Sequence, residues 1–403
     1  MIDLGLARIG RLLRHTPQTW TALHVAGTNG KGSICAYLSA LLHATGGRSA
    51  RFTSPHLVDR WDCIAVDEKP VSEALFRDAE AAVSRRDREH RIGATPFELL
   101  TATAFEIFVR SKVQYGVVEV GMGGRLDATN ALDHKAVAVI SKIGLDHQGF
   151  LGNTLEEIAL HKAGVMRPGV PCVVDNTNQP SVLKAIEAHA RDVGTEIVYP
   201  SAAALDALAG RGFEPHQVQN IACAEAAFRL TCPEEDASLS HILPVIDRVQ
   251  WPGRLQHVDI SSITGRQERV LLDGAHNVQS AEVLAGYVRK HLRSKDRGVT
   301  WVLAASDGKD LDGILGLLLD PHDHVAAVRF GPVDGMPWVQ PADPSSILAL
   351  ASKKGVSESQ QYSGTSLEAA LRWAASAAKS DPLVIAGSLY LVSDVLRLLR
   401  SAT

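Results

Sequence analysis

The sequence contains a glycine-rich segment, residues 27–33, that lies between an apolar run and a helix-like stretch at 34–42. Glycines let successive backbone N–H groups converge on an anion, and the start of the following helix adds the positive end of its dipole. Lys31 supplies a positive charge, and Ser33 offers a hydroxyl that suits Mg²⁺. The pattern predicts a phosphate-binding loop. The alternative, an ordinary tight glycine turn, explains neither the lysine nor the serine.

The segment departs from the general P-loop pattern at two positions. That pattern has glycine where Val25 stands, and Ser or Thr directly after the lysine, where this chain has Gly32. Further strings that carry polar or glycine residues follow along the chain: 53–57 (TSPHL), 97–101 (FELLT), 119–130 (EVGMGGRLDATN), 145–147 (LDH), 162–164 (KAG), 251–255 (WPGRL), 273–277 (DGAHN) and 387–390 (GSLY).

Taken in order, the loop and these strings resemble the folate branch of the Mur ligases, which contains dihydrofolate synthases and folylpolyglutamate synthases. The resemblance covers nearly the whole chain. It implies an ATP-dependent ligase that joins a carboxylic acid to an amine through an acyl phosphate. ATP would be bound by the loop and by three residues outside it: Gly27, Thr28, Asn29, Gly30, Lys31, Gly32, Ser33, Asn220, Arg254 and Asp273.

The resemblance also implies two Mg²⁺ sites, and oxygen ligands suit this cation. The implied ligands are Ser33, Ser54, Glu119, His147 and Lys162. Lys162 would ligate after carbamylation by CO₂, although the Glu that usually precedes this lysine is His161 here. Lys31, Lys162 and His276 are the implied catalytic residues. The sequence leaves open whether the reaction also needs a monovalent cation.

Three residues match positions that hold the pterin in dihydrofolate synthases: Thr95, Phe97 and Asp127. An aromatic ring stacks on a pterin, and a carboxylate accepts from its N–H groups; for Phe97, core packing is the alternative. At 62–64 the chain has Asp-Cys-Ile where the family commonly has Glu-Arg-Ile, so it lacks a guanidinium that binds carboxylates.

These residues favour the addition of L-glutamate to 7,8-dihydropteroate, as in fungal monofunctional members of the family. The alternatives are extension of the glutamate tail of a reduced folate, and a recruited relative that joins another acid to an amino acid. A non-catalytic nucleotide-binding protein is a weaker alternative, because none of the implied metal and nucleotide residues is missing.

The elements that position these residues follow from hydrophobic periodicity. Apolar runs predict strands at 22–26, 116–120, 136–143, 171–174, 270–272, 299–304, 324–329 and 383–386. Helical periodicity appears between them at 98–109, 155–165, 182–193, 279–292 and 366–378. This alternation predicts an α/β fold with mostly parallel sheets, whose binding chemistry gathers at the carboxyl ends of the strands.

The length of 403 residues favours two domains. Proline and glycine at 252 and 253 mark the expected boundary. We expect an ATP-binding domain of the P-loop Mur ligase type at 1–250, with a mostly parallel sheet, and a smaller Rossmann-like ligase domain at 255–403.

The composition is that of an ordinary enzyme. With 41 basic and 45 acidic residues the formal charge is −4, so nothing favours nucleic acid or a membrane surface as a partner. Five scattered cysteines, without CxxC spacing, indicate reduced thiols. We expect a cytoplasmic monomer that acts on small molecules, with import into an organelle such as the mitochondrion left open.

Overall fold

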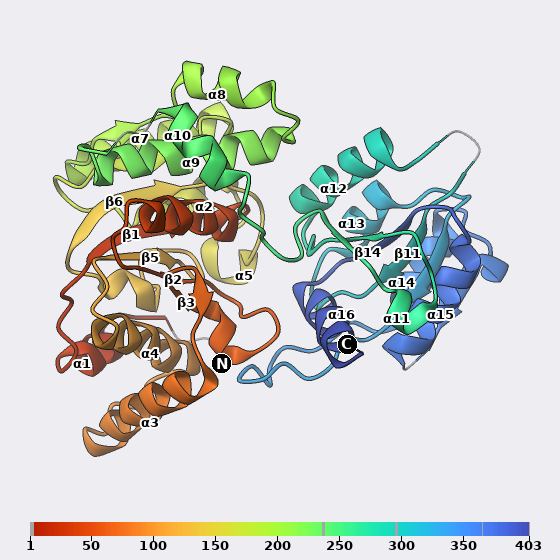
Figure 1. The fold of residues 1–403 in the computed structure, drawn as a ribbon, viewed down its shortest axis with the longest axis horizontal. Coiled ribbons are helices and arrows are strands. Elements are labelled where there is room, and N and C mark those ends of the chain that lie inside the picture. Colours follow the sequence, from red (N-terminus) through yellow and green to blue (C-terminus); the bar gives the residue numbers. More distant parts are fainter. Residues whose placement is uncertain (1–3, 236–237, 295–296, 365, 403) are drawn as a thin grey trace. The chain divides into compact units, whose positions relative to one another are not determined.

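The computed structural model describes residues 4–235, 238–294, 297–364 and 366–402. The chain divides into two compact units, Met1–Gln250 and Trp251–Thr403 (Figure 1). Each unit is an α/β structure with its own sheet and its own core. The two-domain α/β fold predicted from the sequence is confirmed.

The described part of the first unit contains an eight-stranded sheet in the order β4-β3-β2-β5-β1-β6-β7-β8. The strands from β2 to β8 in this order pair in parallel, whereas β3 and β4 form an antiparallel edge. Their bounds are β1 Thr21–Ala26, β2 Ser49–Phe52, β3 Ile64–Val66, β4 Lys69–Pro70, β5 Tyr115–Glu119, β6 Lys135–Ile140, β7 Cys172–Val174 and β8 Ile197–Val198.

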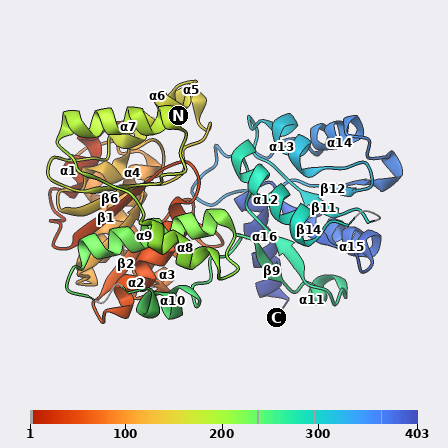
Figure 2. The same cartoon turned by 90° about the horizontal axis from the view of Figure 1, so that it is seen from above.

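Helices cover both faces of this sheet (Figure 2). One face carries α2 (Lys31–Ala44), α8 (Ala202–Ala209), α9 (Pro215–Thr231) and α10 (Leu239–Ile246). The other carries α1 (Ala7–Leu13), α3 (Glu73–Glu89), α4 (Pro96–Arg110), α6 (Leu155–Ala163) and α7 (Pro180–Val193). Three short helices lie in loops: η1 (Arg60–Cys63), η2 (Ala128–Ala131) and α5 (Gln148–Leu151).

The central strand β1 shows how the sequence pattern becomes two core layers. Leu23 and Val25 pack toward α2 and α9, while Ala22 and Ala26 lie among buried residues of the opposite layer. Successive side chains of a strand point to opposite faces, so a strand buried on both sides is apolar at nearly every position. His24 is the exception in this strand and is fully buried.

Local signals in the sequence fix where the site-bearing helices start. Thr95 caps α4 in a capping box with Glu98, and Thr154 caps α6 in the same way with Glu157. Helix α2 instead starts directly after Gly30, which has φ of +89°. Only glycine adopts this conformation without strain.

The described part of the second unit contains a six-stranded sheet in the order β13-β12-β11-β14-β10-β9, parallel except for β9. The strands are β9 Gln256–Val258, β10 Val270–Leu272, β11 Thr300–Leu303, β12 His324–Ala327, β13 Gln361–Ser363 and β14 Leu383–Ala386. Helices α12 (Val278–His291), α13 (Leu311–Leu318) and α14 (Pro344–Lys353) cover one face, and α11 (Ser261–Thr264), α15 (Leu367–Ala378) and α16 (Leu389–Ser401) cover the other (Figure 2). A short helix, η3 (Glu358–Gln360), precedes β13.

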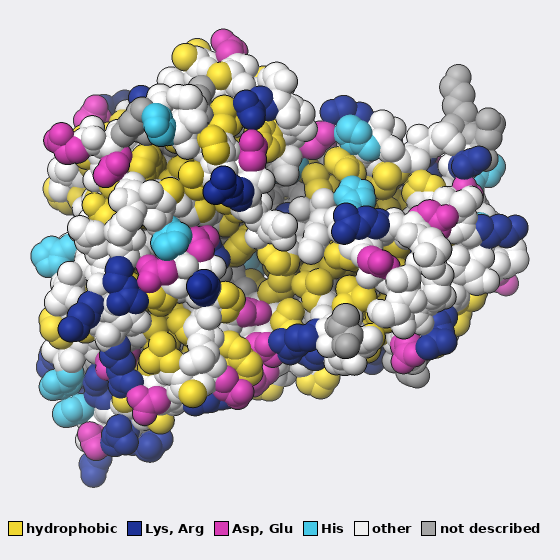
Figure 3. Space-filling model, in the orientation of Figure 1, with side chains coloured by type: hydrophobic (Ala, Val, Ile, Leu, Met, Phe, Trp, Pro, Cys, Tyr) yellow, Lys and Arg dark blue, Asp and Glu magenta, His cyan; other side chains and the backbone are white. Residues whose placement is uncertain are grey.

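Basic and acidic side chains are intermixed on the face of each unit shown in Figure 3.

Among the described residues, no helix is both long enough and apolar enough to cross a membrane.

Candidate functional site: a glycine loop at the carboxyl edge of the first sheet

The glycine loop connects the end of β1 to the start of α2, as the sequence predicts. Its backbone lies too close to its neighbours for side chains at two positions. A Cβ atom on Gly27 would collide with the hydroxyl of Ser141, and one on Gly30 would collide with the amide oxygen of Asn220. The two glycines therefore allow the loop to pack against the end of β6 and against α9.

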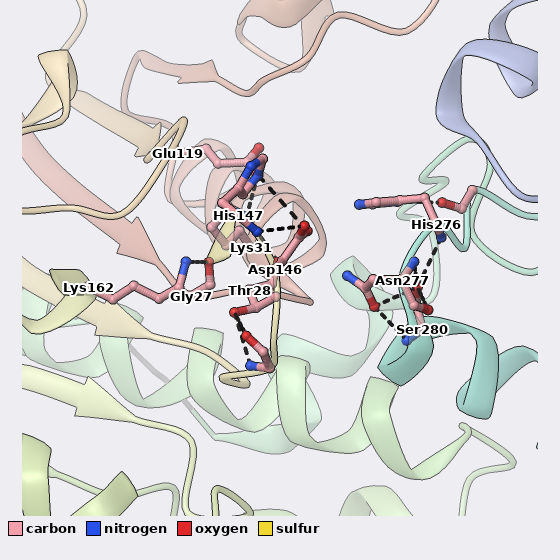
Figure 4. A network of polar contacts seen from close by, with 12 residues as sticks. Gly27, Thr28, Lys31, Glu119, Asp146, His147, Lys162, His276, Asn277 and Ser280 are labelled. Carbon is pink, nitrogen blue, oxygen red and sulfur yellow. Dashed lines mark hydrogen bonds and ion pairs between the residues drawn. The ribbon is translucent and has the colours of Figure 1, made fainter. Parts of the chain in front are cut away.

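Hydrogen bonds from the segment after β6 hold the loop in place (Figure 4). The backbone N–H groups of Thr28 and Asn29 donate to the carbonyl of Lys142, at 2.9 and 3.1 Å. The Thr28 hydroxyl donates to the carbonyl of Gly144 at 3.0 Å, and the Ser141 hydroxyl donates to the carbonyl of Asn29 at 2.8 Å. These hydrogen bonds hold the loop against the segment after β6.

Lys31 and Glu119 place opposite charges beside this loop. The Nζ atom of Lys31 donates to the carbonyl of Thr28 at 3.1 Å and lies 3.7 Å from Oε1 of Glu119. Glu119 is buried at the carboxyl end of β5, and its Oε2 accepts from the backbone N–H of Ser54 at 3.2 Å. The expected ligands Glu119 and Ser54 therefore lie together.

Lys162 reaches the loop from α6. Its side chain is buried, and Nζ donates to the carbonyl of Gly27 at 2.7 Å (Figure 4). Burial and the nearby charge of Lys31 lower the pKa of Lys162 to about 7, against the opposing effect of Asp146 and Asp127. Near neutral pH a large fraction of this amine is therefore uncharged.

His147 lies in the segment after β6 and precedes α5 with φ of +54°. Its side chain is exposed, and its Nε2 lies 4.0 Å from Oδ2 of Asp146. Ser33 lies in the first turn of α2. The expected metal ligands thus follow parallel strands whose carboxyl ends meet at one edge of the sheet, except Lys162, which reaches that edge from a helix.

This donor set fits Mg²⁺. Within the described ranges, no three His, Cys, Asp or Glu side chains form a cluster that could hold a metal ion. The expected set does not need one, because it combines hydroxyl groups, a single carboxylate, an imidazole and a modified lysine. A carboxylate beside a glycine loop and serine hydroxyls are hard oxygen ligands, which suit Mg²⁺ bound together with phosphates.

Asn220 lies on α9 and is buried, with its amide against Gly30. It therefore contacts the loop, and its contact with a nucleotide stays a prediction. The neighbouring Gln219 donates from Nε2 to Oδ1 of Asn176 at 2.8 Å, which ties α9 to the segment after β7.

The three expected pterin residues have structural partners of their own. Thr95 caps α4, as described above. The partly buried ring of Phe97 stacks on Phe52, with centroids 6.3 Å apart, and a Cβ atom on Gly121 would collide with it. Core packing thus accounts for part of the surface of Phe97, and its contact with a pterin stays a prediction.

The Asp127 carboxylate is almost fully buried, at 1% exposure. It accepts from the backbone N–H of Met122 at 2.8 Å, and from the backbone N–H and hydroxyl of Thr129 at 3.0 and 2.5 Å. Burial raises the pKa of Asp127, and these hydrogen bonds oppose the shift. The carboxylate closes the 121–127 loop, and its contact with a pterin also stays a prediction.

The second unit brings its own expected residues together. Asp273 follows β10 and accepts from the backbone N–H groups of Leu255 and Ala275, both at 2.8 Å. Burial raises the pKa of Asp273, although Arg254 and these two hydrogen bonds lower it. His276 lies beside the same turn, with Nδ1 2.8 Å from the carbonyl of Gly274.

Sequence reasoning assigned no role to two buried polar residues, His24 and Thr129. The signal was present, because a histidine interrupts an otherwise apolar run at 22–26. It also treated Cys63 as the position of a missing substrate-binding arginine. The structure buries Cys63 in the core beside Phe52 and Phe76, and the link between this position and glutamate binding stays a prediction.

Comparison with known proteins identifies the family of the chain. Residues 25–195 match the Mur ligase middle domain, and residues 256–398 match the C-terminal domain of dihydrofolate synthetase. The chain is 37% identical to a probable dihydrofolate synthetase of Schizosaccharomyces pombe, covering 99% of each chain. It is 36% identical to the dihydrofolate synthetase of Saccharomyces cerevisiae, covering 98% of each.

Two solved structures of similar fold come from bacteria. The Mycobacterium tuberculosis folylpolyglutamate synthase complexed with ADP has a TM-score of 0.84 and 26% identity, covering 99% of this chain and 95% of that one. The Yersinia pestis bifunctional folylpolyglutamate synthase/dihydrofolate synthase complexed with AMPPNP and Mn has a TM-score of 0.82 and 28% identity, covering 99% of this chain and 94% of that one. The chain belongs to the dihydrofolate synthase and folylpolyglutamate synthase family of Mur-type ligases.

Proposed function

We propose that the protein is an ATP-dependent ligase that joins L-glutamate to 7,8-dihydropteroate and yields dihydrofolate, ADP and phosphate. The main support is the arrangement of Lys31, Glu119 and Lys162 around one fixed glycine loop. Lysine and a carboxylate at such a loop suit the transfer of a phosphoryl group, which needs positioning and charge compensation more than a base.

Residues 1–250 are proposed as the ATP-binding domain and residues 255–403 as the C-terminal ligase domain. The Mur ligase match at 25–195 and the dihydrofolate synthetase match at 256–398 support this assignment. The two bacterial structures described above contain ADP, or AMPPNP with Mn, which supports a nucleotide and a divalent cation for this chain as well.

The proposed roles follow the donor chemistry. Ser33, Ser54, Glu119, His147 and carbamylated Lys162 would hold two Mg²⁺ ions, which neutralise phosphate charge when bound. Lys31 compensates charge on the phosphates. The loop residues, Asn220, Arg254 and Asp273 are the proposed ATP-binding residues, and His276 is a proposed catalytic residue. A monovalent cation remains part of the proposal.

Carbamylation of Lys162 is a reaction of its uncharged amine. The nitrogen forms a bond to the carbon of CO₂ and loses a proton, which leaves an anionic oxygen ligand in place of a cation. The lowered pKa of this buried amine supports the step. A ¹³C carbamate signal after incubation with ¹³C-bicarbonate, present in the wild type and absent in Lys162→Arg, is the expected result. An equal signal in both proteins would contradict it.

In the proposed reaction the dihydropteroate carboxylate attacks the γ-phosphorus of ATP and displaces ADP, which gives an acyl phosphate. The glutamate amine then attacks the carbonyl carbon of the acyl phosphate, loses a proton and displaces phosphate, which leaves the amide. Thr95, Phe97 and Asp127 are proposed to lie at the pterin. The names of the two full-length fungal relatives support dihydropteroate as the acid. Tail extension of reduced folates is the second candidate, because the bacterial neighbours include a folylpolyglutamate synthase.

We place the enzyme in the cytoplasm as a monomer. Its five cysteines are buried free thiols, as a reducing compartment allows.

The first experiment compares acceptors. Purified protein is incubated with MgATP and L-glutamate, and phosphate release and product mass are measured with dihydropteroate or with tetrahydrofolate. Turnover with dihydropteroate alone is expected. Turnover with tetrahydrofolate shifts the assignment to tail extension, and no turnover with either indicates a ligase for another acid.

A further inference from the structure

A histidine in the middle of the central strand is not used by the proposed reaction. His24 lies in β1 between β5 and β6, in register with Val118 and Ala138, and its side chain is fully buried. An apolar side chain at this position would stabilise the fold more, because a buried imidazole loses its hydration and this raises the free energy of the folded state. The residue therefore needs a reason other than packing.

His24 is the first member of a chain of hydrogen bonds. Its Nε2 lies 2.8 Å from the hydroxyl oxygen of Thr129, and that hydroxyl donates to Oδ1 of Asp127 at 2.5 Å. A threonine hydroxyl has one proton, so the oxygen that donates to Asp127 must accept from His24. Nε2 therefore carries the proton of the ring. Burial lowers the pKa of His24 and keeps the ring neutral, with smaller contributions from Lys135 and Arg167.

The other ring nitrogen supports the same conclusion. Within the described residues, Nδ1 of His24 is buried without a hydrogen-bond partner. The structure thus leaves the acceptor Nδ1 unsatisfied, while the Nε2–H group donates to Thr129. A buried polar atom without a hydrogen bond costs folding free energy, and such atoms are usually found where a particular arrangement of side chains is required.

The chain of hydrogen bonds ends at the loop beside the expected pterin residues. Oδ2 of Asp127 accepts from the backbone N–H of Met122, which closes the 121–127 loop. The first residue of this loop, Gly121, packs against the ring of Phe97. The position of the loop therefore bears directly on the surface that Phe97 leaves for a substrate.

We propose that His24 and Thr129 are positioning residues that hold the 121–127 loop through Asp127, and that they thereby set the affinity for the acid substrate. This inference rests on the proposed function for the identity of that acid. It does not depend on a direct contact between Asp127 and the substrate.

Two pairs of variants test the proposal. Thr129→Val removes the hydroxyl at nearly constant volume, whereas Thr129→Ser retains it. His24→Leu removes the donor, whereas His24→Gln presents an N–H at a similar reach. Thr129→Val should raise the KM for dihydropteroate about 10-fold, the effect of one lost hydrogen bond to a charged group. His24→Leu should raise it about fivefold, the effect of one lost hydrogen bond between neutral groups, and the KM for ATP should stay within about twofold in both. The Ser and Gln variants should restore most of the affinity.

A merely structural role predicts a different pattern. Because β1 leads directly into the glycine loop, general damage to the strand would raise the KM for ATP as much as that for dihydropteroate. Equal changes in the two KM values, or the same loss in Thr129→Ser as in Thr129→Val, would overturn the proposal. If a urea titration shows that His24→Leu is not folded, the Thr129 pair still tests the hydrogen bond between Thr129 and Asp127.

A second measurement is independent of activity, so it separates this proposal from the proposed function. Amide hydrogen exchange followed by mass spectrometry should show faster exchange at 121–127 in Thr129→Val than in Thr129→Ser, with the 27–33 loop unchanged. No difference at 121–127 would refute the positioning role. Failure of the wild type to use dihydropteroate, together with that difference, would refute only the proposed substrate.

Discussion

The Nζ atom of Lys162 lies 2.7 Å from the carbonyl oxygen of Gly27, although 135 positions of sequence separate the two residues. This hydrogen bond joins a helix on one face of the sheet to the first glycine of the phosphate-binding loop. A buried amine at this point is both an anchor for the loop and a candidate for modification, and its protonation should affect stability as well as activity.

The folding stability should therefore depend on Lys162 in a defined pH window. The pKa of Lys162 is about 7 in the folded protein, against 10.5 as the ordinary value. Between these values the unfolded chain binds one proton more, so the free energy of unfolding should rise with pH, by at most about 1.4 kcal/mol per pH unit. Urea titrations from pH 7 to 10 in CO₂-free buffer measure this slope.

Lys162→Met should reduce that slope, whereas the same change at the exposed Lys184 should leave it unaltered. Lys135, whose pKa burial lowers to about 6, contributes a slope of the same sign. Lys135 is present in both variants, so its contribution to the slope is the same in the two and does not affect the comparison. Equal slopes in Lys162→Met and Lys184→Met would contradict the expectation.

Removal of either charge beside the loop should abolish turnover without unfolding the protein. Lys31→Ala and Glu119→Ala are each expected to lower kcat by at least about 100-fold, because phosphoryl transfer depends on charge placed in advance. The exposed ion pair of Arg372 with Glu368 offers a control, and Arg372→Ala should retain wild-type activity. A Lys31→Ala enzyme that keeps most of its activity would refute the role assigned to this lysine.

Two glycines give a matched test of the loop. Gly30→Ala forces a side chain into φ of +89° and against Asn220, so it should raise the KM for ATP and lower the free energy of unfolding by about 1–3 kcal/mol. Gly286 lies inside α12 with open space around it. Gly286→Ala should stabilise the protein by about 0.5–1 kcal/mol and leave the KM for ATP unchanged. Thermal unfolding and ATP titrations measure both, and a tolerated Gly30→Ala would argue against a close-packed loop.

The second unit contains a buried charge whose loss should be costly. Asp323 is fully buried and accepts from both Nη atoms of Arg293 at 2.8 and 2.9 Å, from the Trp301 indole at 2.9 Å and from the Val299 N–H at 2.8 Å. Asp323→Ala should destabilise the unit by about 3–5 kcal/mol, because the partly buried Arg293 guanidinium and the buried N–H donors of Trp301 and Val299 lose this acceptor.

The control for this change is Asp320, whose exposed carboxylate lies 2.8 Å from the same guanidinium. Asp320→Ala should lower the free energy of unfolding by less than about 1 kcal/mol, because a surface ion pair usually contributes no more than that. Urea titrations of the two variants compare the values, and similar losses would show that Asp323 has no special role.

Much of the fold follows from the sequence because its signals are local. The run at 22–26 and the glycines after it predict β1 and the loop, and Thr95 with Glu98 marks the start of α4. The same holds for the strand before Asp273. These features depend on periodicity, glycine conformation and capping, which act within a few residues.

The partnerships between distant side chains were decided only by the tertiary structure. Sequence types alone do not show that Lys162 reaches Gly27, that His24 reaches Asp127 through Thr129, or that Cys63 is buried in the core. Each depends on which strands are neighbours in the sheet and which face a side chain occupies. The sequence thus determined the chemistry available to this protein, and the packing of its parallel sheet decided which groups act together.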